Sequence, residues 1–209
     1  MLTLEQVRKH LADYQPPELD SSVERRAAVA MLLRDNNGTT EILLIKRAEH
    51  DKDPWSGDLG FPGGQIEATD SSPRAAAERE TWEEIGLKLE EANYLGQSGS
   101  LTGAYLSIHV SCFIYQIDPD TEFKLNGEVV SLFWIPVATL LEPQRNQQLT
   151  FFYRGRHRQH PVIKLDEWSE RPLWGITYRL IENFLKLFGL SFTHPEGHQD
   201  SSPHEKVNR

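Results

Sequence analysis

The sequence predicts an α+β protein built as an α/β/α sandwich, in which a mixed β-sheet lies between helices. Short apolar segments typical of strands alternate with segments of helical periodicity, and turn sequences between neighbouring strands favour antiparallel hairpins. The chain has 209 residues and is 38% hydrophobic, with five Trp, nine Phe and six Tyr. These numbers fit one domain with a substantial core and short additions at its ends.

The first part of the chain predicts a helix followed by a hairpin. Residues Leu2–Tyr14 alternate apolar and charged side chains at roughly helical spacing and end before Pro16, which predicts a short N-terminal helix. Ala27–Leu33 and Glu41–Ile45 are apolar segments that flank Asn36-Asn37-Gly38, a sequence typical of the tight turn of a β-hairpin.

A second helix is predicted over Pro73–Ile85. Ser72 supplies a capping hydroxyl, Pro73 suits the first helical position, and Gly86 is a favourable C-terminal stop. Ala75 and the two alanines that follow it favour helix in between.

The rest of the chain predicts further strands and a final helix. The expected elements are strands at Tyr94–Leu101, Ile108–Ile117 and Ser131–Ile135, a helical turn at Val137–Leu141, a hairpin of Leu149–Tyr153 and Pro161–Leu165 whose tip is RGRHRQH, and a helix at Trp174–Phe188. We expect a helix and lead-in over residues 1–24, the main domain over 25–190, and a polar, disordered tail over 191–209.

The charge and the cysteine content exclude some classes of protein. The formal net charge is −9, whereas nucleic-acid-binding proteins carry a basic footprint, so we expect no nucleic-acid partner. Cys112 is the single cysteine, which excludes an internal disulfide and fits a reducing compartment. No apolar run approaches the ~20 residues of a membrane span, and no secretory h-region is present, so we expect a cytoplasmic protein without a membrane partner.

Three glutamates share one face of the second helix. Glu83 and Glu84 follow Glu80 by three and four residues, which at ~100° per residue places the three carboxylates together. Like charges at this spacing cost roughly 0.2–0.5 kcal/mol per pair, and a bound divalent cation reverses that cost. Oxygen ligands grouped in this way suit Mg²⁺ or Mn²⁺, whereas a solvated acidic face, with Arg79 paired to Glu83, is the structural alternative.

The stretch from Gly64 to Leu87 resembles the signature of the Nudix hydrolase family. It reads G-QIEAT-D-SSPRAAAE-RE-TW-EE-I-GL, against Gly, five residues, Glu, seven residues and then Arg-Glu-apolar-x-Glu-Glu-x-Gly-apolar. Asp70 stands where Glu is usual, eight residues separate it from Arg79, and Thr81 takes an apolar position. The substitution and the extra residue are similar to the signature of the coenzyme A pyrophosphatase branch of the family.

Residues 43–64, LLIKRAEHDKDPWSGDLGFPGG, are similar to the upstream motif of that branch. Arg47, Ala48, Gly57 and the FPGG sequence match it. Lys52 stands where Arg is usual, and one extra residue lies between Arg47 and Gly57, so other substrates stay open. WGITYRLI, at the start of the last helix, is similar to another motif of the branch, and the resemblance covers about residues 25–188.

Nudix enzymes cleave a nucleoside diphosphate linked to another group and use divalent metal. The resemblance therefore implies a Nudix fold, a small-molecule nucleoside diphosphate substrate and Mg²⁺ or Mn²⁺ as the cofactor; it leaves a homodimer open. It implies that Arg79 pairs with a neighbouring carboxylate and orients Glu80. The implied metal ligands are Glu80, Glu83, Glu84, the backbone carbonyl of Gly64 and, as a weaker ligand or an orienting group, Asp70.

The general base varies across the family. Glu80 is one candidate and Glu128 is another, although Glu128 fits a solvated turn equally well. The residues implied to bind substrate are Arg47, Lys52, Gly63 and Gly64. The basic run at 154–160 fits a solvated hairpin tip better than a site that steers an anionic substrate.

Three functions follow from the resemblance. The first is a coenzyme A diphosphatase that releases 3′,5′-ADP and 4′-phosphopantetheine or its acyl form. The second keeps the chemistry and changes the substrate to ADP-ribose, a nucleotide sugar or a nucleoside triphosphate. The third is a Nudix module that binds without turnover, which the retention of Arg79, Glu80, Glu83 and Glu84 disfavours.

Overall fold

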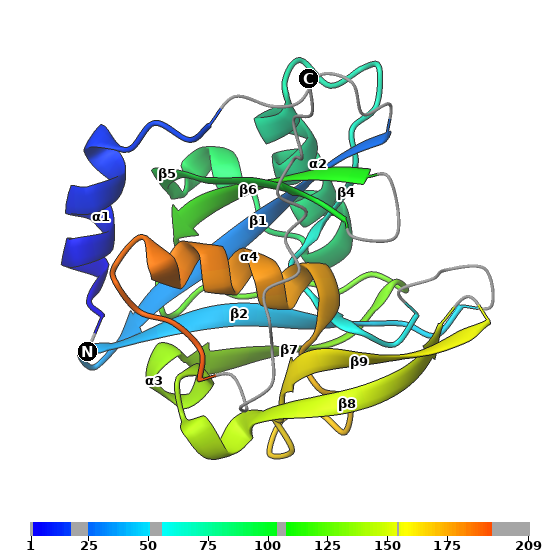
Figure 1. Ribbon diagram of the computed structural model, residues 1–209. Coiled ribbons are helices and arrows are strands. Elements are labelled where there is room, and N and C mark those ends of the chain that lie inside the picture. The colour runs from blue at the N-terminus through cyan, green and yellow to red at the C-terminus, as the bar shows by residue number, and fades with distance from the viewer. Residues whose placement is uncertain (1, 18–24, 51–55, 104–107, 154, 194–209) are drawn as a thin grey trace, which may run out of the picture.

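A seven-stranded mixed sheet with helices on both faces forms the body of the protein, and a separate two-stranded hairpin adjoins it (Figure 1). The structure is a computed structural model and describes residues 2–17, 25–50, 56–103, 108–153 and 155–193. The strand order is β3-β2-β1-β6-β5, with β4 paired to β1 and β7 paired to β2. The predicted α+β sandwich is confirmed.

The elements have the following bounds in the chain. The helices are α1 (Leu4–Asp13), α2 (Pro73–Ile85), α3 (Val137–Leu140) and α4 (Gly175–Lys186), and the 3-10 turns are η1 (Leu89–Glu91) and η2 (Pro143–Arg145). The strands are β1 (Arg25–Asn36), β2 (Thr39–Arg47), β3 (Leu59–Gly60), β4 (Gly63–Gln65), β5 (Asn93–Thr102), β6 (Ile108–Gln116), β7 (Val129–Pro136), β8 (Asn146–Tyr153) and β9 (Arg156–Ile163).

The first hairpin is the predicted one. Asn37 and Gly38 both have positive φ, 52° and 84°, which are the conformations that a two-residue hairpin turn of the primed type requires. The strands on either side of the turn pair in register from Asn36↔Thr39 to Leu33↔Ile42. On its other side β1 runs parallel to β6, which makes the sheet mixed.

Strand β1 contributes to the core on both faces of the sheet. Ala27, Met31 and Leu33 pack in the apolar cluster that includes α1 and α4, whereas Ala28 and Leu32 pack in the cluster that includes α2. Because successive side chains of a strand point to opposite faces, this division places α4 and α2 on opposite sides of the sheet. The near-continuous apolar run in the sequence of β1 follows from this double burial.

Helix α2 begins and ends where the sequence predicts. The Ser72 hydroxyl accepts a hydrogen bond from the backbone N–H of Ala75 at 3.1 Å, and Pro73 occupies the first turn. Gly86 ends the helix in the left-handed conformation, with φ of 69°. The helix packs against β1 and β4, and so it delivers its acidic face to the edge of the sheet at β4.

The second hairpin differs from its prediction. The expected tip of seven residues, RGRHRQH, is wrong, because β9 already begins at Arg156 and pairs fully with β8, from Tyr153↔Arg156 to Asn146↔Ile163. Arg158 and His160 are therefore strand residues opposite Phe151 and Leu149. A two-stranded hairpin with a solvated part tolerates charged side chains at paired positions. Its sequence therefore lacks the apolar alternation that identifies strands.

The remaining predicted elements agree with the structure to within a few residues. Helix α4 spans Gly175–Lys186, and Gly189 beyond it has positive φ, as expected of a helix stop. Within the described ranges, no helix is long and apolar enough to cross a bilayer. The expected tail falls outside the described residues from 194 onward, and the division of the chain at residues 24 and 190 stays a prediction.

Candidate active site

The backbone of Gly64 lies directly against the carboxylate of Glu80. Strand β4 pairs with β1 through Gly64↔Ala28 and Gly63↔Val29, and α2 packs over it. A Cβ atom on Gly64 would lie 2.5 Å from Oε1 of Glu80, so only glycine leaves room for the carboxylate. The two glycines of the FPGG sequence therefore bring main chain into contact with the acidic helix.

Glu84 lies one helical turn further along and is almost completely buried, with 2% of its side chain exposed. Its Oε2 accepts a hydrogen bond from the backbone N–H of Gly63 at 2.9 Å, and its Oε1 lies 3.3 Å from Nη1 of Arg47. Burial raises the pKa of Glu84 to about 7, and the charges of Glu80 and Glu128 add to the increase.

Arg79 joins Asp70 and Glu80. Its Nε and Nη2 donate to the two oxygens of Asp70, each at 3.0 Å, and its Nη1 donates to Oε1 of Glu80 at 2.9 Å. Asp70 also accepts from the backbone N–H of Glu67 at 2.8 Å, and its side chain is only 5% exposed. The bidentate pair lowers the pKa of Asp70 and raises that of Arg79, so both groups are charged and fixed.

Glu83 points away from the buried part of this arrangement. Its side chain is 52% exposed, and its Oε2 lies 3.2 Å from Nη1 of Arg79, the atom that also binds Glu80. The solvated pairing with Arg79 that the sequence offered as an alternative is present for this residue. Of the three glutamates that share a helical face, Glu80 and Glu84 face β4 and Glu83 lies at the rim.

Glu128 lies at the other side of the same site. It is exposed and precedes β7, and its backbone carbonyl accepts a hydrogen bond from the N–H of Ala48 at 2.7 Å. Its carboxylate is close enough to raise the pKa values of both Glu80 and Glu84 electrostatically. Lys52, the other candidate for substrate binding, lies outside the described residues.

The donor atoms at this site fit a hard divalent cation. Glu80 and Glu84 offer oxygen atoms beside the backbone of Gly64, and burial raises the pKa values of both carboxyls, a cost that a cation would offset. Across the described part of the chain, no three acidic, histidine or cysteine side chains already surround one point. Nη1 of Arg79 instead donates to one oxygen of Glu80 and one oxygen of Glu83.

A cleft of about 370 Å³ leads to Gly63 and Gly64 from the α4 side of the sheet. Its walls come from the start of β1, the end of β9 and the first turns of α4. Trp174 lines it and packs face to face on Phe151, with ring centroids 4.5 Å apart, while His160 contacts the same indole. The cleft and α2 lie on opposite faces of the sheet and meet at the two glycines of β4.

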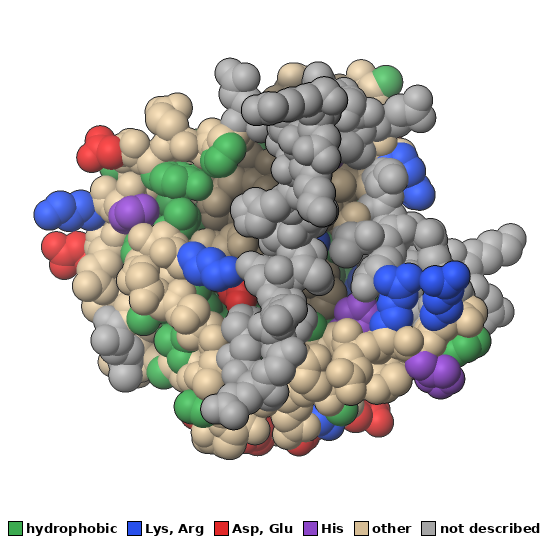
Figure 2. Space-filling view, viewed as in Figure 1, with side chains coloured by type: hydrophobic (Ala, Val, Ile, Leu, Met, Phe, Trp, Pro, Cys, Tyr) green, Lys and Arg blue, Asp and Glu red, His purple; other side chains and the backbone are tan. Residues whose placement is uncertain are grey.

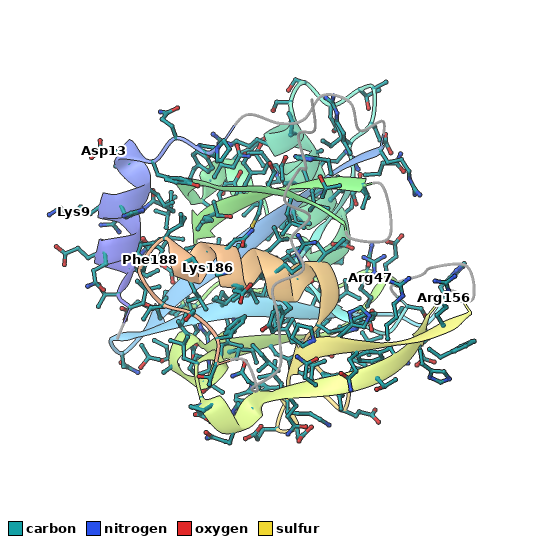
Figure 3. All side chains as sticks on the ribbon, viewed as in Figure 1. Lys9, Asp13, Arg47, Arg156, Lys186 and Phe188 are labelled. Atoms are coloured by element: carbon teal, nitrogen blue, oxygen red, sulfur yellow. The ribbon has the colours of Figure 1, made fainter. Side chains whose placement is uncertain are left out.

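Basic side chains gather at the outer end of the β8–β9 hairpin, away from the cleft. Figure 2 shows Lys, Arg and His side chains over the outer end of the β8–β9 hairpin, and Figure 3 places Arg156 at that outer end, beyond Arg47. Among the described residues of the predicted basic run, 155–160, only His160 lines the cleft.

Two arginines of the cleft were missed by the sequence reasoning. Arg25 begins β1 and Arg179 belongs to α4, and both line the cleft. Arg179 lies within the WGITYRLI segment, so the motif indicates this part of the chain but does not single out the arginine. Arg25 lies ahead of every motif, and only the pairing of β1 with β4 and β6 reveals its place.

The family model for the NUDIX domain matches residues 24–154, which is more than half of the chain. The chain belongs to the Nudix hydrolase family. The hydrolases of this family act on pyrophosphate bonds and generally use divalent metals, and the acidic helix over Gly64 is the signature that the match contains.

Several curated relatives are similar to this Nudix chain. The human mitochondrial coenzyme A diphosphatase NUDT8 is 30% identical over 163 residues, covering 77% of this chain and 68% of that protein. The uncharacterised Nudix hydrolase NudL of Cronobacter sakazakii is 28% identical over 192 residues, covering 90% and 96%. An uncharacterised protein of Schizosaccharomyces pombe is 30% identical over 158 residues, and the match spans 48%, about half, of its length.

Among solved structures, a MutT/nudix family protein from Enterococcus faecalis superposes with a TM-score of 0.54. It is 16% identical in sequence, and the superposition covers 88% of this chain and 69% of that one. At this identity the likeness concerns the fold alone. It agrees with the mixed sheet between helices.

Proposed function

We propose that this Nudix hydrolase cleaves the diphosphate bond of coenzyme A or acyl-coenzyme A, giving 3′,5′-ADP and 4′-phosphopantetheine or its acyl form. The observation that carries the choice of substrate is the similarity to a coenzyme A diphosphatase over 68% of that protein's length. The upstream sequence ending in FPGG, whose two glycines lie at the inner end of the cleft, supports the same choice.

In this proposal Glu80, Glu84 and the backbone carbonyl of Gly64 hold Mg²⁺ or Mn²⁺, with Glu83 as a further ligand from the rim. When bound, such a cation neutralises the diphosphate, polarises a phosphoryl oxygen and activates water. The protein contributes a fixed geometry, because Gly64 has no side chain to displace Glu80, and Gly63 holds Glu84 by its N–H.

We assign Asp70 the orienting role rather than that of a ligand. Both of its oxygens already bind Arg79, and the N–H of Glu67 adds a third hydrogen bond. Arg79, fixed in this way, positions Glu80 from 2.9 Å. Partners of this kind outside the ligand set typically change metal affinity or activity by about 10–100-fold when removed.

For the general base we favour Glu128 over Glu80. Glu80 already accepts a hydrogen bond from Arg79, and it is needed as a ligand. Glu128 forms no ion pair with another described residue, is exposed, and lies close enough to act on both buried glutamates. Its carboxylate would accept a proton from the attacking water.

Arg47 and Lys52 would bind the diphosphate oxygens, and Gly63 and Gly64 would let the diphosphate approach closely because they carry no side chains. Arg47 lies 3.3 Å from Glu84, so it stands beside the ligands and can turn to phosphate when a cation compensates Glu84. In this arrangement the guanidinium of Arg47 pairs with Glu84 before substrate binds and with the diphosphate afterwards.

A panel of substrates tests the proposal. The purified chain is incubated with Mg²⁺ or Mn²⁺ and coenzyme A, acetyl-coenzyme A, ADP-ribose, UDP-glucose, NADH or dGTP, and the products are identified by mass. We expect 3′,5′-ADP from the two coenzyme A compounds at rates well above the others. Preferential cleavage of ADP-ribose, a nucleotide sugar or a triphosphate would contradict the proposed substrate but not the proposed metal site. The altered spacing between Arg47 and Gly57 allows such a substrate.

A further inference from the structure

The cleft carries positive charge at the corner far from the acidic helix. Arg25 and Arg179 both line it, and both are exposed. Within the parts of the chain that the structure describes, neither forms an ion pair with a carboxylate. The chain has a net charge of −9, whereas two arginines without carboxylate partners give this corner of the cleft a local positive charge.

The sheet brings these two arginines to the same corner. Arg25 pairs with Ile108 in the parallel register of β1 and β6, and Ile108 accepts the N–H of Gly103 at 2.9 Å. Nη1 of Arg179 donates to the carbonyl of Thr102, the last residue of β5, at 3.0 Å. Thr102 and Arg25 are thus two strands apart, roughly 10 Å, with Ile108 between them on the cleft floor.

The corner lies at a defined distance from the acidic end. Gly64 and Gly63 pair with Ala28 and Val29, which follow Arg25 by three and four residues along β1. At about 3.3 Å per residue, the separation along the strand is roughly 10–13 Å. A ligand that reaches both the glycines and this corner therefore needs a second anionic group beyond its diphosphate.

We propose that Arg25 and Arg179 form a second anion subsite, which binds a phosphate monoester that the substrate carries in addition to its diphosphate. The proposal rests on the proposed function and specifies its substrate class: a nucleoside diphosphate derivative with a further phosphate on the ribose. Guanidinium groups match phosphate oxygens with paired hydrogen bonds. The hydrogen bond to Thr102 fixes the guanidinium of Arg179 and leaves its other donors for the ligand.

Equilibrium binding tests this subsite without turnover. The affinities of adenosine 3′,5′-bisphosphate and 5′-AMP for the full chain are measured by calorimetry without divalent metal. We expect the bisphosphate to bind at least about tenfold more tightly, because charge-assisted hydrogen bonds are the stronger class. Arg25→Ala and Arg179→Ala should each reduce this ratio severalfold and leave the affinity for 5′-AMP nearly unchanged.

Lys186→Ala is the matched control. Lys186 is a cation on the same helix as Arg179, it does not line the cleft, and Figure 3 shows it at the opposite end of α4 from Arg47. Its removal should leave the ratio unchanged. Unfolding curves of each variant identify any loss of folded protein, and Arg25→Ala gives an independent result if Arg179→Ala, which loses the bond to Thr102, is unstable.

Two outcomes overturn the subsite. The first is that the wild-type chain binds both nucleotides with equal affinity. The second is that all three variants lower the affinity for both nucleotides alike, which would indicate a general charge effect. A parallel assay compares kcat/KM for coenzyme A and 3′-dephospho-coenzyme A in the presence of Mn²⁺. Equal kcat/KM values for the two compounds would contradict the subsite but still support the hydrolase activity. A preference for the bisphosphate in binding, without hydrolysis of either compound, would contradict the proposed function but still support the subsite.

Discussion

Asp70 holds the guanidinium of Arg79 through two hydrogen bonds of 3.0 Å, and the same guanidinium holds Glu80 at 2.9 Å. The aspartate that departs from the usual Nudix signature therefore has a defined partner. Asp is shorter than Glu by one methylene, yet both of its oxygens reach the guanidinium of Arg79. The altered signature forms a complete ion-pair chain from Asp70 to Glu80.

Replacement of Asp70 tests this chain. Asp70→Asn should reduce kcat/KM by about 10–100-fold, because the amide cannot accept both hydrogen bonds from Arg79. The free energy of unfolding should fall by about 1–3 kcal/mol, since a nearly buried partner is lost. Kinetics and urea unfolding measure the two effects. Glu67→Gln, an exposed carboxylate in the same loop, serves as the control and should change neither quantity.

Gly64→Ala should displace Glu80. The added Cβ would lie 2.5 Å from Oε1 of Glu80, a distance that forces either the strand or the carboxylate to move. We expect a loss of at least about 100-fold in kcat/KM, comparable to that of a misplaced catalytic group. Gly127→Ala meets nothing within 4 Å and should behave like wild type. Wild-type activity in Gly64→Ala would refute the contact between Gly64 and Glu80.

Glu84 predicts a dependence of stability on pH when divalent metal is absent. Burial raises its pKa to about 7, whereas in the unfolded chain the value is near 4.5. The folded state binds more protons between these values, so the free energy of unfolding should decrease as pH rises from about 4.5 to 7, by about 3 kcal/mol in total. Urea unfolding in EDTA at several pH values measures this slope.

The contribution of Glu84 is isolated by substitution. Glu84→Gln keeps the shape of the side chain without a titrating proton, so its slope over the same range should be shallower than that of the wild-type chain. Added Mn²⁺ should flatten the wild-type slope, since a cation favours the ionised carboxylate. Identical slopes in EDTA for the two proteins would contradict the assignment.

Glu128→Gln separates the two candidate bases. If Glu128 accepts the proton from water, kcat should fall by about 10²–10⁴-fold while the affinity for Mn²⁺ stays nearly constant. Glu80→Gln, in contrast, should reduce both kcat and the affinity for Mn²⁺. Rate measurements and metal titration by calorimetry distinguish these patterns. A Glu128→Gln variant with full activity would leave Glu80 as the base.

Much of this fold could be predicted from local sequence. The caps Ser72 and Gly86 and the turn at Asn37-Gly38 act over a few residues, so the bounds of α2 and the first hairpin follow directly. Strand β9 could not be found in this way, because its pairing partner β8 and its solvated face allow a polar sequence.

The candidate site, like the fold, could be predicted only where local sequence determines it. The glutamates and glycines of the signature were found because their spacing in the chain is itself the pattern. The bidentate Asp70–Arg79 pair and the proximity of Glu84 to Arg47, 37 residues apart, depend on how the loop and the strand fold over the helix. Arg25 and Arg179 reach one cleft only through the order of strands β1, β6 and β5.

The most direct test of the account is hydrolysis of coenzyme A in H₂¹⁸O by the wild-type chain and by Glu80→Gln, with Mn²⁺ present and products resolved by mass. Wild type should yield 3′,5′-ADP and 4′-phosphopantetheine, one of which carries a single ¹⁸O, and Glu80→Gln should be slower by orders of magnitude. Intact coenzyme A after prolonged incubation with wild type, or equal rates for the two proteins, would contradict it.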